Sequence, residues 1–156
     1  MKRVVFISST GGHLAELLQL KGMFEKYDYH IITEKTKTNV LLKNKYKDRI
    51  HFLEYGNKHN LPVYMVVLPI NIIKSVMLFL KIRPEVIVTT GAHTCVPLCY
   101  FAKIFGKKII YIETFANKET KTLTGKIIYP IADLFIVQWE EMLKLYPKAV
   151  YGGWIY

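Results

Sequence analysis

Short, almost continuously apolar runs alternate with helix-forming runs along the sequence, and this alternation limits the fold more than any other feature. Strands that are apolar at nearly every position are typical of a parallel sheet covered on both faces. Alternating strand–helix units form the doubly wound α/β fold, whose ligands bind beyond the carboxyl ends of the strands. We therefore predict a single α/β domain over residues 1–156 with a mostly parallel, Rossmann-like sheet. Strands are expected over 4–8, 29–33, 50–54, 85–90, 108–113, 134–137 and 149–151, and helices over 14–26, 39–46, 61–82, 95–105, 125–131 and 140–145.

The loop after the first expected strand has the composition of an anion-binding loop. Ser9, Thr10, Gly11 and Gly12 follow the apolar run, and a helix-forming stretch begins directly after His13. Such a turn presents backbone N–H groups and the positive end of a helix dipole to a ligand, and phosphate is the usual ligand. We assign the two hydroxyl residues and the two glycines to phosphate binding. His13 is a candidate general base or phosphate ligand; the alternative is a helix-start residue with no function.

Common nucleotide and nucleophile motifs do not fit this loop. A dinucleotide fingerprint requires Gly-x-Gly-x-x-Gly, but the glycines at 11 and 12 are adjacent and the third is replaced, although Glu34 lies at the right distance for a ribose-binding carboxylate. A Walker A loop also fails, because no Gly-Lys-Ser/Thr follows at the required spacing. Ser9 does not stand in Gly-x-Ser-x-Gly, so there is no nucleophile elbow. The loop thus indicates phosphate without indicating a nucleotide class.

Two further strand ends are expected at the same edge of the sheet. Gly91, His93 and Thr94 follow the strand over 85–90, and we assign them to substrate contact. Glu113 ends the strand over 108–113, where a carboxylate can accept hydrogen bonds from sugar hydroxyls or act as a catalytic base. The alternative for Glu113 is a solvated carboxylate at a strand end.

The charge and the cysteines limit the partners. Lys and Arg number 22 and Asp and Glu 12, a net charge of +10, which indicates an anionic partner unless it serves only solubility. The basic residues are scattered and no recognition module is visible, so nucleic acid is not expected. Cys95 and Cys99 lie four apart on an expected helix, where a disulfide is strained and a metal lacks further ligands. We expect reduced core cysteines, no metal and no cofactor, and no signal peptide before the first strand.

The stretch over 61–82 is apolar and long enough to cross a membrane, and three interpretations stay open. It can be an ordinary crossover helix, which a parallel sheet requires between consecutive strands. It can lie in the membrane interface with its exposed apolar side, helped by neighbouring basic residues. A true span is disfavoured by Pro69, Asn71, Lys74 and Ser75. The residues assigned to membrane association are Val66, Val67, Ile70, Ile73, Lys74 and Met77.

The C-terminal part is rich in aromatic residues. Trp139, Tyr151 and Trp154 are candidates for a partner interface, and the alternative is that they pack against their own domain. Lysines and an arginine over 43–49 would add attraction to an anionic membrane surface.

Several blocks of the sequence together resemble one family. The loop over 8–16 resembles the first glycine loop of MurG-type GT-B glycosyltransferases. The other blocks are similar to the membrane-anchoring subunit of the eukaryotic UDP-N-acetylglucosamine transferase, which acts on dolichol-linked sugar, and to bacterial PssD-type proteins of capsule and exopolysaccharide biosynthesis. These blocks are Thr90-Gly91-Ala92 with Pro97, Tyr111-Ile112-Glu113, Thr124-Gly125-Lys126, Ala132-Asp133, Val137-Gln138-Trp139, Tyr146-Pro147 and Tyr151-Gly152-Gly153.

The resemblance implies that the chain is the N-terminal half of a GT-B enzyme, inactive alone, which binds a polyprenyl-diphosphate-linked sugar acceptor. A donor-binding subunit, the GT-B C-terminal half, would supply the UDP-sugar, so no donor domain and no N-terminal membrane helix are expected here. The family carries an arginine near Asn117, which we retain as a substrate-binding residue without the charge contact. His13 or Glu113 would position or deprotonate the acceptor hydroxyl, and this chemistry needs no metal.

The implied location is the cytoplasmic face of the plasma membrane, as a peripheral, monotopic protein. Two other functions stay open at this point. The chain can be a non-catalytic membrane anchor or enhancer of its partner, or a stand-alone nucleotide-binding Rossmann protein.

Overall fold

A computed structural model of the chain describes residues 1–56 and 60–155. Within them the strands form one sheet in the order β3-β2-β1-β4-β5-β6-β7, and every neighbouring pair is parallel. The order reverses between β1 and β4, which makes their carboxyl ends the switch point of a doubly wound sheet. The predicted α/β architecture is thereby confirmed. The strands are β1 (Arg3–Ser8), β2 (Asp28–Lys35), β3 (Ile50–Glu54), β4 (Val86–Gly91), β5 (Lys108–Ile112), β6 (Leu134–Val137) and β7 (Val150–Tyr151).

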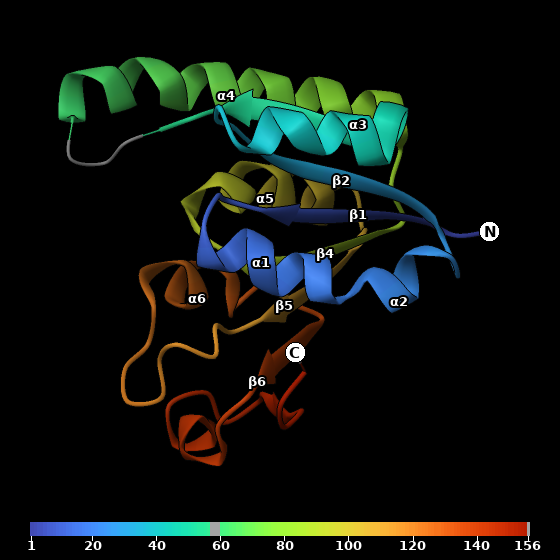
Figure 1. Cartoon of the computed structure of the whole chain (residues 1–156). Coiled ribbons are helices and arrows are strands. Elements are labelled where there is room, and N and C mark those ends of the chain that lie inside the picture. Colours follow the sequence, from blue (N-terminus) through green and yellow to red (C-terminus); the bar gives the residue numbers. More distant parts are fainter. Residues whose placement is uncertain (57–59, 156) are drawn as a thin grey trace.

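Helices cover both faces of the sheet because successive strand residues point to opposite faces. Phe6 on β1 packs in one core with Leu17, and its neighbour Ile7 packs in the other core with Phe79 and Leu98. Figure 1 shows α1 in front of the sheet and α5 behind it. The helices are α1 (Gly12–Gln19), α2 (Lys21–Phe24), α3 (Leu42–Tyr46), α4 (Leu61–Ile82), α5 (Val96–Ile104) and α6 (Leu123–Ile128), with 3₁₀ turns η1 (Asn39–Leu41), η2 (Lys47–Arg49), η3 (His93–Cys95) and η4 (Glu140–Lys144).

Several predicted helices differ from the structure: the one expected over 39–46 is η1 followed by α3, and the one expected over 125–131 is α6, which begins and ends earlier. The helix expected over 14–26 is divided into α1 and α2, because the Leu20 N–H bonds to the Leu17 carbonyl three residues back and tightens the chain at that point. The helix expected over 140–145 is the 3₁₀ turn η4. Cys95 and Cys99 are free and buried, as predicted.

Helix α4 is the crossover from β3 to β4, and its bounds are those predicted. Asn71 fixes it to the edge strand: its Oδ1 accepts the Glu54 N–H at 2.7 Å, and its Nδ2 donates to the Glu54 carbonyl at 2.8 Å. Phe79 and Ile82 are buried, yet only 17% of the most apolar 18-residue window of α4 is buried. In the part of the chain that the structure describes, α4 is the helix whose length and composition would suit a membrane crossing.

Candidate functional site

The loops that follow β1 and β4 are hydrogen-bonded to each other at the switch point of the sheet. The Ser9 N–H donates to the Gly91 carbonyl at 3.0 Å, and the Ala92 N–H donates to Ser9 Oγ at 3.4 Å. The predicted convergence of these two strand ends is present. Ser9 itself is buried, so its hydroxyl serves this junction and is turned away from solvent.

The start of α1 leaves its backbone donors open. Gly11 is the N-cap residue, with φ at 72°, and no side chain caps the helix there. Gly11 and Gly12 are both exposed. The first N–H groups of a helix have no partner within it, and an anion placed there would accept them and meet the positive end of the dipole. The geometry agrees with the predicted phosphate site, which stays a prediction.

His13 is held against the β4 loop by two reciprocal contacts. Its Nδ1 lies 2.7 Å from the Thr90 carbonyl oxygen, and Thr90 Oγ1 donates to the His13 carbonyl at 2.7 Å. Because a carbonyl only accepts, Nδ1 donates this hydrogen bond, and in the uncharged form of the ring the lone pair is therefore on Nε2. Gly91 has φ at 92°, and a Cβ there would lie 3.4 Å from the His13 ring, so a glycine permits this approach.

A buried carboxylate that sequence analysis did not place in the site lies under the loop. Glu34 at the end of β2 is 1% exposed; it accepts a hydrogen bond from Thr94 Oγ1 at 2.5 Å and another from the Thr10 N–H at 3.3 Å. His93 Nε2 lies 3.6 Å from the same carboxylate. Asn39 Nδ2 donates to Thr10 Oγ1 at 3.2 Å. The hydrogen bonds of Thr94 and Thr10 to Glu34 therefore hold the glycine loop from inside. The sequence signal for this role of Glu34 is an acidic residue at the end of an otherwise apolar strand.

Glu113 is enclosed by donors and does not open onto the crevice. It is 1% exposed and accepts hydrogen bonds from Thr122 Oγ1 and Tyr146 Oη at 3.0 Å, and from the Thr114 N–H at 3.1 Å. Burial raises the pKa of the Glu113 carboxyl, and these hydrogen bonds oppose the rise. The alternative of a solvated strand-end carboxylate is wrong, since Tyr146 folds over it. The geometry favours a positioning function for Glu113, and its assignment as a base stays a prediction.

Glu16 links α1 to the loop after β5, and sequence analysis did not assign it a function. Its Oε1 accepts from Thr114 Oγ1 at 2.8 Å and from the Phe115 N–H at 3.1 Å. Its Oε2 is buried without a hydrogen-bond partner among the described residues. Helix α1 and the loop after β5 are thereby connected, although Glu113 itself points to Thr122 and Tyr146 and not to α1.

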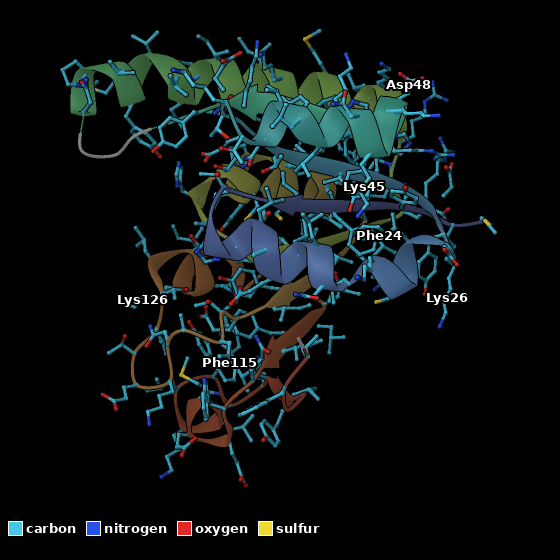
Figure 2. The ribbon with its side chains drawn as sticks, in the orientation of Figure 1. Phe24, Lys26, Lys45, Asp48, Phe115 and Lys126 are labelled. Atoms are coloured by element: carbon cyan, nitrogen blue, oxygen red, sulfur yellow. The ribbon has the colours of Figure 1, made fainter. Side chains whose placement is uncertain are left out.

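The remaining predicted residues lie apart from this junction. Asn117 is in the loop after β5 and binds its own turn, with Nδ2 2.9 Å from the Thr120 carbonyl. Trp139 Nε1 donates to the Phe115 carbonyl at 2.8 Å, and the Phe115 ring lies against both Trp139 and Trp154. Figure 2 labels Phe115 among the C-terminal elements. Trp139 packs within the domain, while Trp154 is 71% exposed and Tyr151 is exposed on β7.

A hollow of about 610 Å³ borders the glycine loop on the side of β2. Thr10 and Gly11 contribute to its wall, together with Thr36, Asn39 and apolar residues of α1 and α3. It does not include His13, His93 or Glu113. The structure thus brings the predicted loops together but distributes their side chains over two sides of the junction.

The residues assigned to membrane association lie on α4, and their assignment stays a prediction. Val66, Ile70, Ile73 and Met77 are exposed, and Val67 is half-buried. Side chains of α4 project along the outer side of the molecule (Figure 2). Lys74 lies 2.5 Å from Glu54 Oε1, so its charge is compensated within the protein.

No group of His, Cys, Asp and Glu within residues 1–56 and 60–155 is placed to hold a metal ion.

Comparison with known sequences gives consistent matches. Residues 3–155 match the family described as "Oligosaccharide biosynthesis protein Alg14 like". The UDP-N-acetylglucosamine transferase subunit ALG14 of Rattus norvegicus is 30% identical over 182 residues, covering 96% of this chain and 81% of the relative. The subunit of the same name from Yarrowia lipolytica is 27% identical and covers 97% of the chain and 80% of the relative.

Comparison with solved structures gives the fold. MurG of Acinetobacter baumannii superimposes with a TM-score of 0.71 at 13% identity, over 90% of this chain and 43% of that structure. UDP-GlcNAc 2-epimerase of Methanocaldococcus jannaschii gives 0.71 at 15% identity, over 96% of the chain and 46% of that structure. The chain spans less than half the length of these GT-B enzymes, and at such identities the likeness shows the shared Rossmann-like fold alone.

Proposed function

The chain belongs to the Alg14-like family of oligosaccharide biosynthesis proteins, and on this premise we propose that it is the acceptor- and membrane-binding subunit of a two-chain, UDP-sugar-dependent glycosyltransferase. The acceptor is a sugar linked to a polyprenyl diphosphate. A partner subunit with the other half of a GT-B fold binds the UDP-sugar and completes the active site. We place the pathway in capsule or exopolysaccharide synthesis on the resemblance to PssD-type proteins alone.

The observation that carries the proposal is that one molecule combines an uncapped helix start with an exposed apolar helix. The open N–H groups behind Gly11 suit a diphosphate, which offers several acceptor oxygens and negative charge. Helix α4 suits the membrane that contains the lipid part of the same acceptor. A phosphate site without the helix, or the helix without the site, would fit many other proteins.

His13 is the residue we assign to the acceptor hydroxyl. The bond from Nδ1 to Thr90 fixes the ring and leaves Nε2 as a proton acceptor, which is the form that a general base requires. In this scheme the hydroxyl of the acceptor attacks the anomeric carbon of the donor sugar, its proton passes to Nε2, and UDP leaves on the partner subunit. Glu113 and Glu34 hold the surrounding loops.

The donor-binding partner is expected at the C-terminal aromatic residues. Trp154 is largely exposed and its ring rests edge-on against Phe115, and Tyr151 is exposed on the last strand of the sheet. Exposed aromatic side chains beside a sheet edge are typical of interface centres. We assign Trp154 and Tyr151 to this contact, and Trp139 supports Trp154 through the Phe115 ring, which lies against both.

Reconstitution tests the proposal. The chain is expressed with and without the protein encoded by the neighbouring gene, and membranes are assayed for transfer from UDP-N-acetylglucosamine to polyprenyl-diphosphate-linked sugar. We expect transfer only when both chains are present. Full activity of this chain alone, or of the partner alone in the same membranes, would overturn it.

A second candidate function is a non-catalytic anchor that recruits the partner to the membrane. The burial of Glu113 favours it, since this carboxylate has no face toward the crevice. The two candidates differ at His13, because an anchor without catalytic residues would tolerate its removal.

A further inference from the structure

An apolar groove runs between α4 and α5 on the outer side of the sheet. Its volume is about 680 Å³. Leu68, Ile72 and Val76 form one wall; they lie four residues apart and so share one stripe of α4. Val96 and Tyr100 are among the residues of the opposite wall, on α5. Figure 1 shows α5 beneath α4, and the two helices are in contact.

The groove is separate from the stripe of α4 that faces outward. Ile73 and Met77 are more than half exposed and do not line it, whereas the next residue back, Ile72, does. From Tyr64 to Val76 the groove follows α4 for about 18 Å, at 1.5 Å per residue. Phe101 also lines the groove, and its ring packs against the buried Phe79 with centroids 5.1 Å apart.

One end of the groove is polar and lies at the loop after β4, which is hydrogen-bonded to the glycine loop. His93 lines that end, and its ring lies edge-on against Tyr64 with centroids 5.5 Å apart. The preceding residue, Ala92, donates its N–H to Ser9 Oγ in the glycine loop. A long apolar groove whose polar end lies next to the loop bonded to the glycine loop suits a lipid chain whose phosphate is bound at that loop.

We propose that the α4–α5 groove binds the isoprenoid chain of the acceptor lipid next to its diphosphate, so that the protein selects its acceptor by chain type as well as by sugar. This inference rests on the proposed function. In it α4 has two sides: the outward stripe contacts the bilayer, and the groove stripe takes one lipid chain out of it.

The test compares two lipids that share a head group. Phosphatidylcholine vesicles carry either undecaprenyl diphosphate or diacylglycerol diphosphate at equal density, and binding of the full chain is measured by flotation. Both lipids offer a diphosphate and a bilayer, so only the chain differs. We expect at least about tenfold tighter binding to the polyprenyl vesicles, since both chains start inside the bilayer and only the branched isoprenoid chain is expected to fit closely against the groove walls.

Two tryptophan variants locate the effect. Ile72→Trp fills the groove and should remove the preference between the two lipids while diphosphate-dependent binding persists. Leu80→Trp is the matched control, because Leu80 is an exposed leucine on the same helix that does not line the groove. It should keep the preference.

The outcomes separate this inference from the function on which it rests. Equal affinity of the unmodified chain for both diphosphate lipids would overturn the groove assignment and leave the acceptor function intact. An equal loss of the preference in Ile72→Trp and Leu80→Trp would do the same. Sedimentation measures whether Ile72→Trp changes self-association of the chain. If it does while the lipid preference is retained, the groove is assigned to a second copy of the chain. Binding no tighter than to plain phosphatidylcholine would overturn the acceptor function itself.

Discussion

His13 and Thr90 bond to each other twice, with Nδ1 of the histidine 2.7 Å from the Thr90 carbonyl oxygen and Oγ1 of the threonine 2.7 Å from the His13 carbonyl oxygen. The two residues come from different strand–helix units, which are 77 positions apart in the chain. These two hydrogen bonds fix the imidazole over the switch point of the sheet. The first of them also decides which ring nitrogen can accept a proton.

His13→Ala should lower sugar transfer by the two-chain enzyme by about 10²–10⁴-fold, the usual contribution of a general base. The assay is initial-rate transfer with the partner present, and co-purification of the partner shows that the complex still forms. His13→Gln, which keeps a hydrogen bond to Thr90 but provides no base, is the companion variant. Rates within a factor of about two of the unmodified enzyme would identify the chain as a non-catalytic anchor.

Gly125→Ala should destabilise the fold by about 1–3 kcal/mol, as overpacked sites do. A Cβ at this position would collide with the Glu113 carboxylate and the Tyr146 hydroxyl, which are both buried. Urea unfolding measures the effect. Gly22→Ala is the control, because its Cβ would meet nothing within 4 Å in α2, and we expect it to be neutral or slightly stabilising. Equal stability of the two variants would contradict the packing around Glu113.

Glu113 should make stability depend on pH in a defined direction. Burial raises its pKa in the folded state above the ordinary value of 4.5, so the folded state binds the proton more tightly than the unfolded state. Its contribution is fully present below the unfolded pKa and is lost as pH rises through the higher folded pKa. We expect Glu113→Gln to remove this loss, seen as a flatter profile of unfolding free energy from pH 4.5 upward.

The same profile for Asp133→Asn serves as the control for Glu113→Gln. The Ile109 N–H and the ammonium groups of Lys103 and Lys108 hold the pKa of Asp133 at about 2, although its partial burial opposes this. A lowered pKa gives the opposite sign: that stability is present above the unfolded pKa and is lost as pH falls. Unchanged slopes in Glu113→Gln would contradict the raised pKa.

Replacing Ile73 and Met77 together by Asp should release the protein from membranes. Both side chains are more than half exposed on the outward stripe of α4, so charge there opposes insertion without a large cost to folding. Flotation with anionic vesicles at low salt is the measurement. Met23→Asp on α2, on the opposite face of the sheet, should bind as the unmodified chain does. Recovery of the double variant wholly with the vesicles would exclude α4 as the membrane contact.

Trp154→Ala should weaken the complex with the donor-binding partner by about tenfold or more, the size of effect found for central aromatic residues of interfaces. The Trp154 side chain is 71% exposed in the isolated chain, so its removal should leave thermal stability nearly unchanged. Isothermal titration with the purified partner gives the affinity. Trp139→Phe is a contrasting variant, since it should lower stability through the lost bond to the Phe115 carbonyl.

Local sequence determined the elements of this protein. The apolar run over 50–54 and the helix over 61–82 have the predicted bounds, because strand and helix periodicities and the terminal Asn60 and Pro62 are properties of adjacent residues. The glycine loop after β1 was likewise visible in the sequence, since its hydroxyl residues and glycines are contiguous. From the alternation of these elements the doubly wound sheet followed directly.

Only the tertiary structure decided which way the functional side chains point. Glu113 is closed in by Tyr146, which is 33 positions away, and Thr94 is turned onto Glu34 at a distance of 60 positions. The groove beside Ile72 exists only because α4 and α5 pack together. A strand end fixes where a residue stands, but its burial, its partners and its pKa depend on distant segments that the local pattern does not contain.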